Sequence, residues 1–241
     1  MKLVNKVIVI TGGTSGIGYV FAQRLHRENT VIVTGTNTTK LKEMEAKGFI
    51  TYKCNLASND EIEACALSLQ NSLPHIDVLF NNAGVQFNYP FVDGISPNSK
   101  VAQEMNVNVC GQVVLTNLLL PLICSSKSGA IINTTSGLSR FPKYDGLVYS
   151  MSKAAMHSFT IGLKYFLKAH KIRVMEFIPP VTATNMTASR NETKMSPEEL
   201  VDKVLPQIER ERAIVTTRKM RFFLVIAALF PSLANRILNK K

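Results

Sequence analysis

The chain has 241 residues, which suits a single compact domain with a sizeable hydrophobic core. Hydrophobic residues make up 46% and charged residues 19%, so the composition excludes an intrinsically disordered protein. The formal net charge is +11, but residues 210–241 alone carry eight Lys or Arg and one Glu, and the rest contains no recognisable DNA- or RNA-binding motif. We therefore expect no nucleic-acid partner.

The cysteines and the N-terminal residues indicate the cellular setting. Cys54, Cys65, Cys110 and Cys124 form no CxxC pair and have no histidine at metal-ligand spacing, so we expect neither a disulfide framework nor a metal site. The first apolar run is one strand long and leads into a glycine turn, which does not fit a secretory signal. No stretch approaches the ~20 apolar residues of a membrane-spanning helix. A cytoplasmic protein is the simplest expectation.

Along the chain, short β-branched runs alternate with longer helix-compatible stretches. Such a succession requires crossover connections, which make the strands parallel and place helices on both faces of the sheet. The sequence thus predicts an α/β fold with a single Rossmann-type, doubly wound parallel sheet, which binds ligands at the carboxyl ends of its strands. Strands are expected at residues 6–11, 30–35, 50–55, 76–81, 129–135 and 172–178, and helices at about 16–28, 101–123 and 149–168.

A further helix start follows the last of these strands. Ser196 is a typical N-cap, with Pro197 at the first helical position and Glu199 at the third, so a helix is predicted to about Glu209. Residues 184–196 are polar and show no periodicity, and we interpret this stretch as a mobile lid.

The segment TGGTSGIG, residues 11–18, follows the first strand and opens the first helix. Glycines allow the backbone to approach a pyrophosphate, and the helix N-terminus offers unpaired N–H groups and a positive dipole end. The turn therefore indicates a dinucleotide site, although glycine turns that only join a strand to a helix are also common.

Tyr149 and Lys153 are spaced i and i+4 in a helix-compatible run, so their side chains share one helix face. A phenol with a pKa of ~10 is a poor acid or base at neutral pH, and a nearby ammonium lowers that pKa. On its own, the pair is equally compatible with a solvated surface pair.

Four motifs that occur in this order favour a functional interpretation of the glycine turn and of the Tyr149/Lys153 pair. The TGGTSGIG turn, the NNAG segment at residues 81–84, Ser136 and the Tyr149/Lys153 pair together resemble the short-chain dehydrogenase/reductase family, over about residues 7–186. Asn108 lies where that family has a helix asparagine. The segments LFNNAGVQFNYPF and PPVTAT are also similar to the bacterial DltE-like branch of the family.

The resemblance implies a role for each residue of the expected catalytic set. Ser136 would hydrogen-bond the substrate oxygen, and Tyr149 would exchange a proton with it. Lys153 would bind the nicotinamide ribose and lower the tyrosine pKa, while Asn108 would hold a water that continues a proton path from Lys153. Taken singly, Ser136 also fits a turn residue at a strand end, and Asn108 a polar group in a kinked helix.

The resemblance also implies the cofactor contacts and the kind of cofactor. Gly35 stands where NAD-preferring relatives end the second strand with an acidic residue, and the donors that follow suit a 2′-phosphate, so NADP is expected before NAD. Pro180 replaces a family glycine, and Asn55 an aspartate. The expected cofactor-binding residues are Gly12, Thr14, Ser15, Gly16, Ile17, Gly18, Thr36, Asn37, Asn55, Leu56, Asn82, Ala83, Gly84, Tyr149, Lys153, Pro179, Val181, Thr182 and Thr184.

The resulting hypothesis is an NAD(P)-dependent oxidoreductase acting on an alcohol or carbonyl substrate. The alternative is a non-catalytic dinucleotide-binding sensor or scaffold. Residues 1–209 would form the NAD(P)-binding catalytic domain, and the helices at 101–123 and 149–168 would make a homodimer or homotetramer. A partly apolar substrate is suggested by aromatic residues expected near the mouth of the cleft, which are Phe87, Tyr89, Phe91, Phe141 and Tyr144.

The basic and apolar tail at residues 210–241 has two interpretations. A basic cluster at residues 218–221 precedes the apolar run 222–230, which suits a segment that lies on an anionic membrane, at its inner face. The alternative, which we favour, is a C-terminal element that packs on the domain or across a subunit interface.

Overall fold

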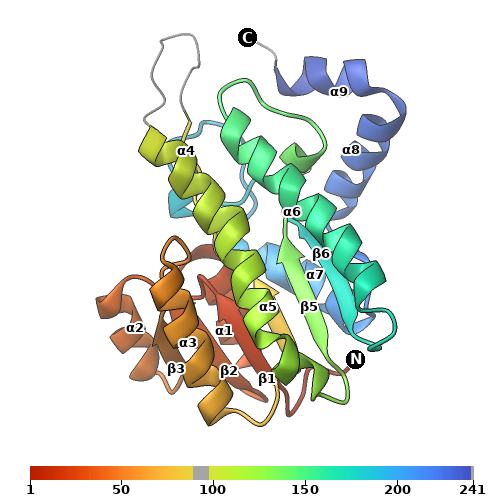
Figure 1. Cartoon of the computed structure of the whole chain (residues 1–241). Coiled ribbons are helices and arrows are strands. Elements are labelled where there is room, and N and C mark those ends of the chain that lie inside the picture. The colour runs from red at the N-terminus through yellow and green to blue at the C-terminus, as the bar shows by residue number, and fades with distance from the viewer. Residues whose placement is uncertain (89–97, 240–241) are drawn as a thin grey trace.

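The computed structural model describes residues 1–88 and 98–239 (Figure 1). All seven strands of its one sheet are parallel, in the order β3-β2-β1-β4-β5-β6-β7. The predicted α/β, doubly wound architecture is therefore confirmed. The strands are β1 (Val7–Thr11), β2 (Thr30–Gly35), β3 (Ile50–Lys53), β4 (Val78–Asn81), β5 (Ala130–Thr134), β6 (Arg173–Ile178) and β7 (Ile214–Thr216).

Helices cover both faces of the sheet (Figure 1). One face carries α1 and α7, and the other carries α3, α5 and α6. The helices are α1 (Gly16–Leu25), α2 (Thr38–Glu45), α3 (Asn59–Ser72), α4 (Asn98–Met105), α5 (Gly111–Cys124), α6 (Leu147–Phe166), α7 (Pro197–Glu209), α8 (Arg218–Leu229) and α9 (Pro231–Leu238).

The core lies on both sides of the sheet because the strands are apolar on both faces. In β1, Ile8 and Ile10 pack toward the α1/α7 side, whereas Val9 packs toward the α3/α5/α6 side. Edge-to-face contacts join Phe80 to Phe21 and Phe177, with ring centroids 4.7 and 5.8 Å apart. This two-sided burial fixes the sheet, and with it the positions where each strand ends.

The sequence analysis missed one strand near the C-terminus and located the start of one helix correctly. The strand β7 was not predicted, because three residues are too short for a period to be recognised. The predicted start of α7 after Ser196 is confirmed, since the Ser196 side chain accepts a hydrogen bond from Glu199 N at 3.1 Å.

The expectation that no stretch is long and apolar enough to span a membrane was wrong. The helical run Ser99–Cys124 has 26 residues and meets that criterion by length and composition. Its inner side is nevertheless part of the protein core, where Leu115, Leu119 and Ile123 are fully buried. The apolar character of this inner side is explained by packing against the sheet.

Candidate active site

A cavity of about 750 Å³ lies at the carboxyl ends of the central strands. Gly12, Thr36, Asn82, Thr135 and Pro179, which directly follow β1, β2, β4, β5 and β6, all line it. This is the edge at which doubly wound sheets bind their ligands, because the winding direction reverses there. The sequence predicted this location.

The glycine turn forms one wall of the cavity. Gly12 and Gly16 adopt φ values of +65° and +56°, which favour glycine. A Cβ atom on Gly12 would lie 2.8 Å from Ala83 Cα, and one on Gly16 would lie 3.1 Å from Thr184 Cγ2. Ser15 precedes α1 without capping it through its side chain, so the first-turn N–H groups stay open to an anion. The cradle fits a dinucleotide pyrophosphate.

The NNAG segment is held by Thr11, the first residue of the glycine motif, and by Gln112, which the sequence analysis did not single out. The Thr11 hydroxyl accepts hydrogen bonds from the backbone N–H groups of Asn82 and Ala83, at 2.9 and 3.0 Å. Gln112 Nε2 donates to Ala83 O at 2.8 Å. Thr11 and Gln112 are both buried, so the loop that lines the cavity rests on a fixed polar support.

Tyr149 and Lys153 both lie on α6 and line the cavity, as does Ser136 after β5. Lys153 is buried, and its ammonium donates a hydrogen bond to Thr134 O at 3.0 Å. Its Nζ lies 5.6 Å from the centre of the Tyr149 ring. The structure thus brings together three of the four expected catalytic residues at one cavity wall.

Burial changes the acidity of both groups on α6. It raises the pKa of Tyr149 to about 12, although the positive charge of Arg190 and a hydrogen bond with Ser136 offset part of this rise. Burial also lowers the pKa of Lys153 to about 8. Lys153 is not among the groups that shift the tyrosine pKa in this structure, so its predicted tuning role stays a prediction.

Asn108 lies in a π-helical turn, Asn106–Cys110, between α4 and α5. Its side chain exchanges hydrogen bonds with the backbone of Val85, at 2.8 Å each, and donates to Ser152 Oγ at 3.1 Å. Such turns are common at functional sites. Here the turn ties the NNAG loop to α6, but Asn108 does not line the cavity, and its predicted water contact stays a prediction.

Most of the expected cofactor residues line the cavity, but Gly18 and Asn37 do not. A Cβ atom on Gly18 would lie 2.6 Å from Gly12 O, so this glycine permits packing inside the turn. Asn37 caps α2 by accepting a hydrogen bond from Lys40 N at 3.0 Å. Those that line the cavity are Gly12, Thr14, Ser15, Gly16, Ile17, Thr36, Asn55, Leu56, Asn82, Ala83, Gly84, Tyr149, Lys153, Pro179, Val181, Thr182 and Thr184.

The segment between β6 and α7 forms part of the cavity wall. Backbone hydrogen bonds link Ala183 N to Met195 O at 2.8 Å and Met195 N to Val181 O at 3.0 Å. Met186, Arg190 and Glu192 of this segment line the cavity. Its position agrees with the predicted lid, and its mobility stays a prediction.

The tail supplies a wall that the sequence analysis missed. Met220 and Phe223 of α8 and Ile237 of α9 line the cavity. The i, i+3 spacing of Met220 and Phe223 was the available signal. The expected aromatic residues Phe87, Phe141 and Tyr144 do not line it, and Tyr89 and Phe91 lie outside the described residues.

Within residues 1–88 and 98–239, no group of three or more His, Cys, Asp or Glu side chains could hold a metal ion. Cys54, Cys65, Cys110 and Cys124 are all free thiols.

Comparison with known proteins identifies the family. The family model described as short chain dehydrogenase matches residues 6–195. The chain belongs to the short-chain dehydrogenase family. Its members are NAD(P)-dependent dehydrogenases and reductases, so this protein is an oxidoreductase.

Two relatives of this short-chain dehydrogenase have the same sequence identity to it but differ in the share of the chain that matches. It is 30% identical over 229 residues to the uncharacterized oxidoreductase DltE of Bacillus subtilis, covering 91% of each chain. It is 30% identical over 192 residues to serine 3-dehydrogenase of Agrobacterium fabrum, covering 76% of this chain and 74% of that one. A short chain dehydrogenase from Burkholderia cenocepacia, solved in complex with NADP, has the same fold, with a TM-score of 0.88, 23% identity and full coverage of both chains.

Proposed function

We propose that this short-chain dehydrogenase interconverts an alcohol and a carbonyl compound, with Tyr149 as the general acid or base. One observation carries the proposal, namely that Tyr149, Lys153 and Ser136 line the same cavity as the glycine cradle. A hydroxyl with a proton to exchange and a second hydroxyl to orient the substrate oxygen are what the reaction needs from the protein.

The residues of the chain divide this work between them. A nicotinamide dinucleotide, when bound, supplies or accepts the hydride. The glycine turn and Thr184 would hold its pyrophosphate end, and Lys153 would hold the ribose next to the nicotinamide. Ser136 donates to the substrate oxygen, and Tyr149 gives that oxygen a proton in reduction or removes one in oxidation. Asn108, with its side chain bonded to Val85 and Ser152, keeps α6 aligned with the NNAG loop.

We also propose that NADP is preferred over NAD. Gly35 and Thr36 at the end of β2 present no carboxylate that would repel a 2′-phosphate, and Thr36 lines the cavity. The solved short chain dehydrogenases of Burkholderia cenocepacia and Sphingobium yanoikuyae contain NADP and NADPH, respectively. A clearly lower KM for NADH than for NADPH would contradict the preference.

The decisive experiment is a screen of alcohols and carbonyls with both cofactors, in which the absorbance of the reduced nicotinamide is followed. Turnover of at least one substrate pair is expected. The sensor or scaffold alternative predicts tight binding of the dinucleotide without turnover of any pair, and a screen with that outcome would favour it.

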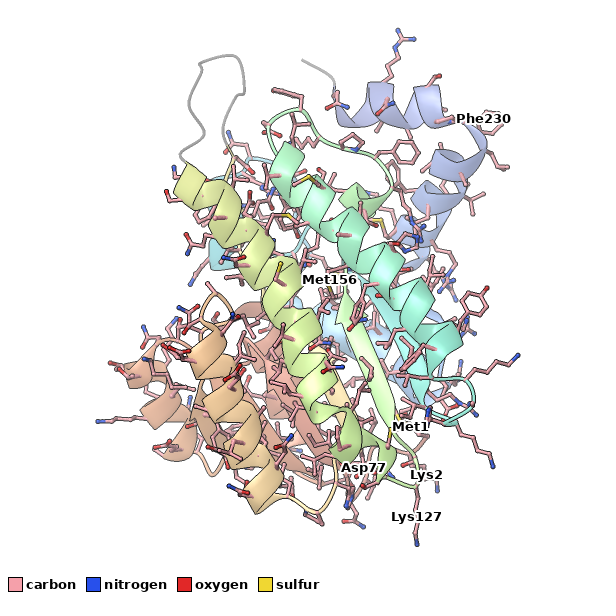
Figure 2. The ribbon with its side chains drawn as sticks, viewed as in Figure 1. Met1, Lys2, Asp77, Lys127, Met156 and Phe230 are labelled. Atoms are coloured by element: carbon pink, nitrogen blue, oxygen red, sulfur yellow. The ribbon has the colours of Figure 1, made fainter. Side chains whose placement is uncertain are left out.

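We further propose that the outer face of α8 and α9 contacts an anionic membrane. Phe222, Leu229 and Phe230 on these helices are more than half exposed, at 68%, 66% and 59%, and Figure 2 shows Phe230 at the outer corner between the two helices. Arg218 and Arg236 are also exposed, and no Asp or Glu occurs after Glu211. Basic side chains beside exposed apolar ones suit anionic headgroups above acyl chains.

Vesicle binding tests this contact. The protein is expected to co-sediment with phosphatidylglycerol vesicles and much less with phosphatidylcholine vesicles, and a Phe222→Ser, Phe230→Ser variant should lose this binding. Leu67→Ser, which removes an exposed apolar side chain from α3, is the matched control. If the double variant instead changes the oligomeric state and vesicle binding is absent, the face joins two copies of the chain.

A further inference from the structure

The side chain of Arg190, which lines the cavity, has one donor without a partner among the described residues, its Nε. It lies in the segment between β6 and α7 and is only 14% exposed. Its Nη2 donates to Gln86 Oε1 at 2.5 Å, and its Nη1 lies 3.6 Å from Glu192 Oε1, beyond hydrogen-bond distance. Its buried Nε has no hydrogen-bond partner among the described residues. A buried charged N–H of this kind normally has an acceptor, and residues 1–88 and 98–239 do not supply one.

The other cations of the cleft are already engaged. Lys153 donates to Thr134 O at 3.0 Å, and Lys143 pairs with Asp145 at 3.3 Å. Among the described residues, four charged side chains line the cavity, three of them positive and one negative, namely Lys143, Lys153, Arg190 and Glu192. Positive side chains therefore outnumber negative ones in the described lining, and of these cations Arg190 is the one with a buried N–H that lacks an acceptor among the described residues.

Arg190 also lies near the reacting group. Its positive charge lowers the pKa of Tyr149, which places the guanidinium within electrostatic range of the phenol. Its partner Gln86 follows the NNAG loop by two residues, and Gln86 also lines the cavity. A ligand group bound by Arg190 would therefore be part of the molecule that exchanges its proton with Tyr149.

We propose that Arg190 binds a carboxylate of the substrate, so that the enzyme acts on hydroxy acids and oxo acids. This inference rests on the proposed function and names its substrate class. The guanidinium presents a planar fork of donors that matches the two oxygens of a carboxylate. A single guanidinium beside the carboxylate of Glu192 suits one negative charge better than two. Met220, Phe223 and Ile237 then form an apolar surface for the remainder of the acid.

Binding can be tested without turnover. Hexanoate and hexanamide have the same shape and differ in charge, and their affinities for the protein with NADP present can be measured by calorimetry. We expect hexanoate to bind about 10- to 100-fold more tightly, the range for a hydrogen bond to a charged group. Arg190→Met should abolish the difference, and Arg190→Lys should restore part of it, because it keeps the charge without the fork.

Two further variants distinguish a loss of carboxylate binding from a loss of folding. Glu192→Gln removes the competing carboxylate and should tighten hexanoate binding, a gain that a misfolded protein cannot produce. Lys194→Met removes a positive charge from the same segment, at a residue that does not line the cavity, and should leave the preference unchanged. Equal affinities for hexanoate and hexanamide in the wild type, or a preference that survives in Arg190→Met, would overturn the proposal.

Kinetics separate this role from a general effect on Tyr149. With 3-hydroxyhexanoate and its methyl ester as substrates, Arg190→Met should lower kcat/KM for the acid about 10- to 100-fold and leave that of the ester almost unchanged. An equal loss for both substrates, with a shifted pH profile, would mean that Arg190 acts only through the tyrosine and would refute carboxylate recognition. If neither is oxidised while hexanoate still binds through Arg190, the carboxylate site stands, and the screen of other alcohols and carbonyls decides the proposed chemistry.

Discussion

At the scale of single residues, burial favours the neutral forms of Tyr149 and Lys153 on α6. The pKa of Tyr149 is raised to about 12, and that of Lys153 is lowered to about 8. At neutral pH the phenol therefore holds its proton firmly, and the lysine remains mostly charged. Positive charge near the phenol is what makes proton exchange feasible, and Arg190 already contributes to it in this structure.

Replacing Tyr149 tests its role directly. Tyr149→Phe should lower kcat by about 10²- to 10⁴-fold, the usual contribution of a general acid or base. The measurement is the absorbance of the reduced nicotinamide, with the affinity for NADPH as a check that the cleft is intact. Tyr144→Phe is the matched control, because Tyr144 is half exposed and does not line the cavity. Full turnover in Tyr149→Phe would remove Tyr149 from the mechanism.

The lowered pKa of Lys153 predicts a dependence of stability on pH. Burial lowers this pKa from 10.5 to about 8, so between these values the unfolded chain binds more protons at this lysine than the folded chain does. The free energy of unfolding therefore rises with pH across this window, by up to about 3 kcal/mol. This stability is lost as the pH falls toward 8.

Lys153→Met lacks this titration. The difference in unfolding free energy between wild type and variant, measured by urea denaturation at pH 8 and again at pH 10, should therefore change in favour of the wild type as the pH rises. Groups elsewhere in the chain cancel in the difference. A difference that does not vary with pH would show that the ammonium of Lys153 is not desolvated.

At the scale of elements, a buried polar network fixes the loop that carries Ser136. Glu176 of β6 is buried and accepts hydrogen bonds from Thr135 Oγ1 at 2.7 Å and Arg140 Nη2 at 3.4 Å. It also contacts His157 Nδ1 of α6 at 3.0 Å, while His157 Nε2 contacts Arg140. Thr135 and Arg140 lie on either side of Ser136, so one carboxylate joins β6, α6 and this loop.

Removing Glu176 should therefore affect both stability and catalysis. Glu176→Ala is expected to lower the free energy of unfolding by about 2–3 kcal/mol, less than for a fully buried pair because Arg140 is partly exposed. It should also lower kcat without raising the KM for NADPH, since the glycine turn is remote from it. Asp202→Ala breaks an exposed pair with Arg24 and should change neither kcat nor stability appreciably. Unchanged kcat in Glu176→Ala would refute the positioning role.

The sequence predicted elements well where their signal is local. The β-branched runs gave six of the strands, and the cap at Ser196 gave the start of α7, because both depend on neighbouring residues. The strand β7 is set by pairing with β6 rather than by its own pattern. Arg190, Met220 and Ile237 were missed for a related reason, because only the folding of distant segments onto one cavity brings them beside Tyr149.

At the scale of the whole molecule, the outer faces of α5 and α6 predict self-association. Tyr165, Phe166 and Ile161 on α6 are 75%, 67% and 45% exposed, which is unusual for large apolar side chains that cluster on one helix. We expect a homodimer or homotetramer through these helices. Tyr165→Glu with Phe166→Glu should shift the protein to a smaller species in analytical ultracentrifugation, whereas Leu67→Glu on α3 should not. A wild type that sediments as a monomer at micromolar concentration would contradict this expectation.

The wall built by α8 and α9 lies beyond residue 195, where the match to the family model ends. The cradle for the dinucleotide and the groups on α6 all come from the matched part, whereas Met220, Phe223 and Ile237 come from one contiguous stretch after β7. Changes in that stretch can therefore alter which substrates fit the cavity, while the dinucleotide cradle and the residues on α6 stay the same. Chimeras in which related enzymes trade only their last two helices should exchange substrate preference while keeping their cofactor preference.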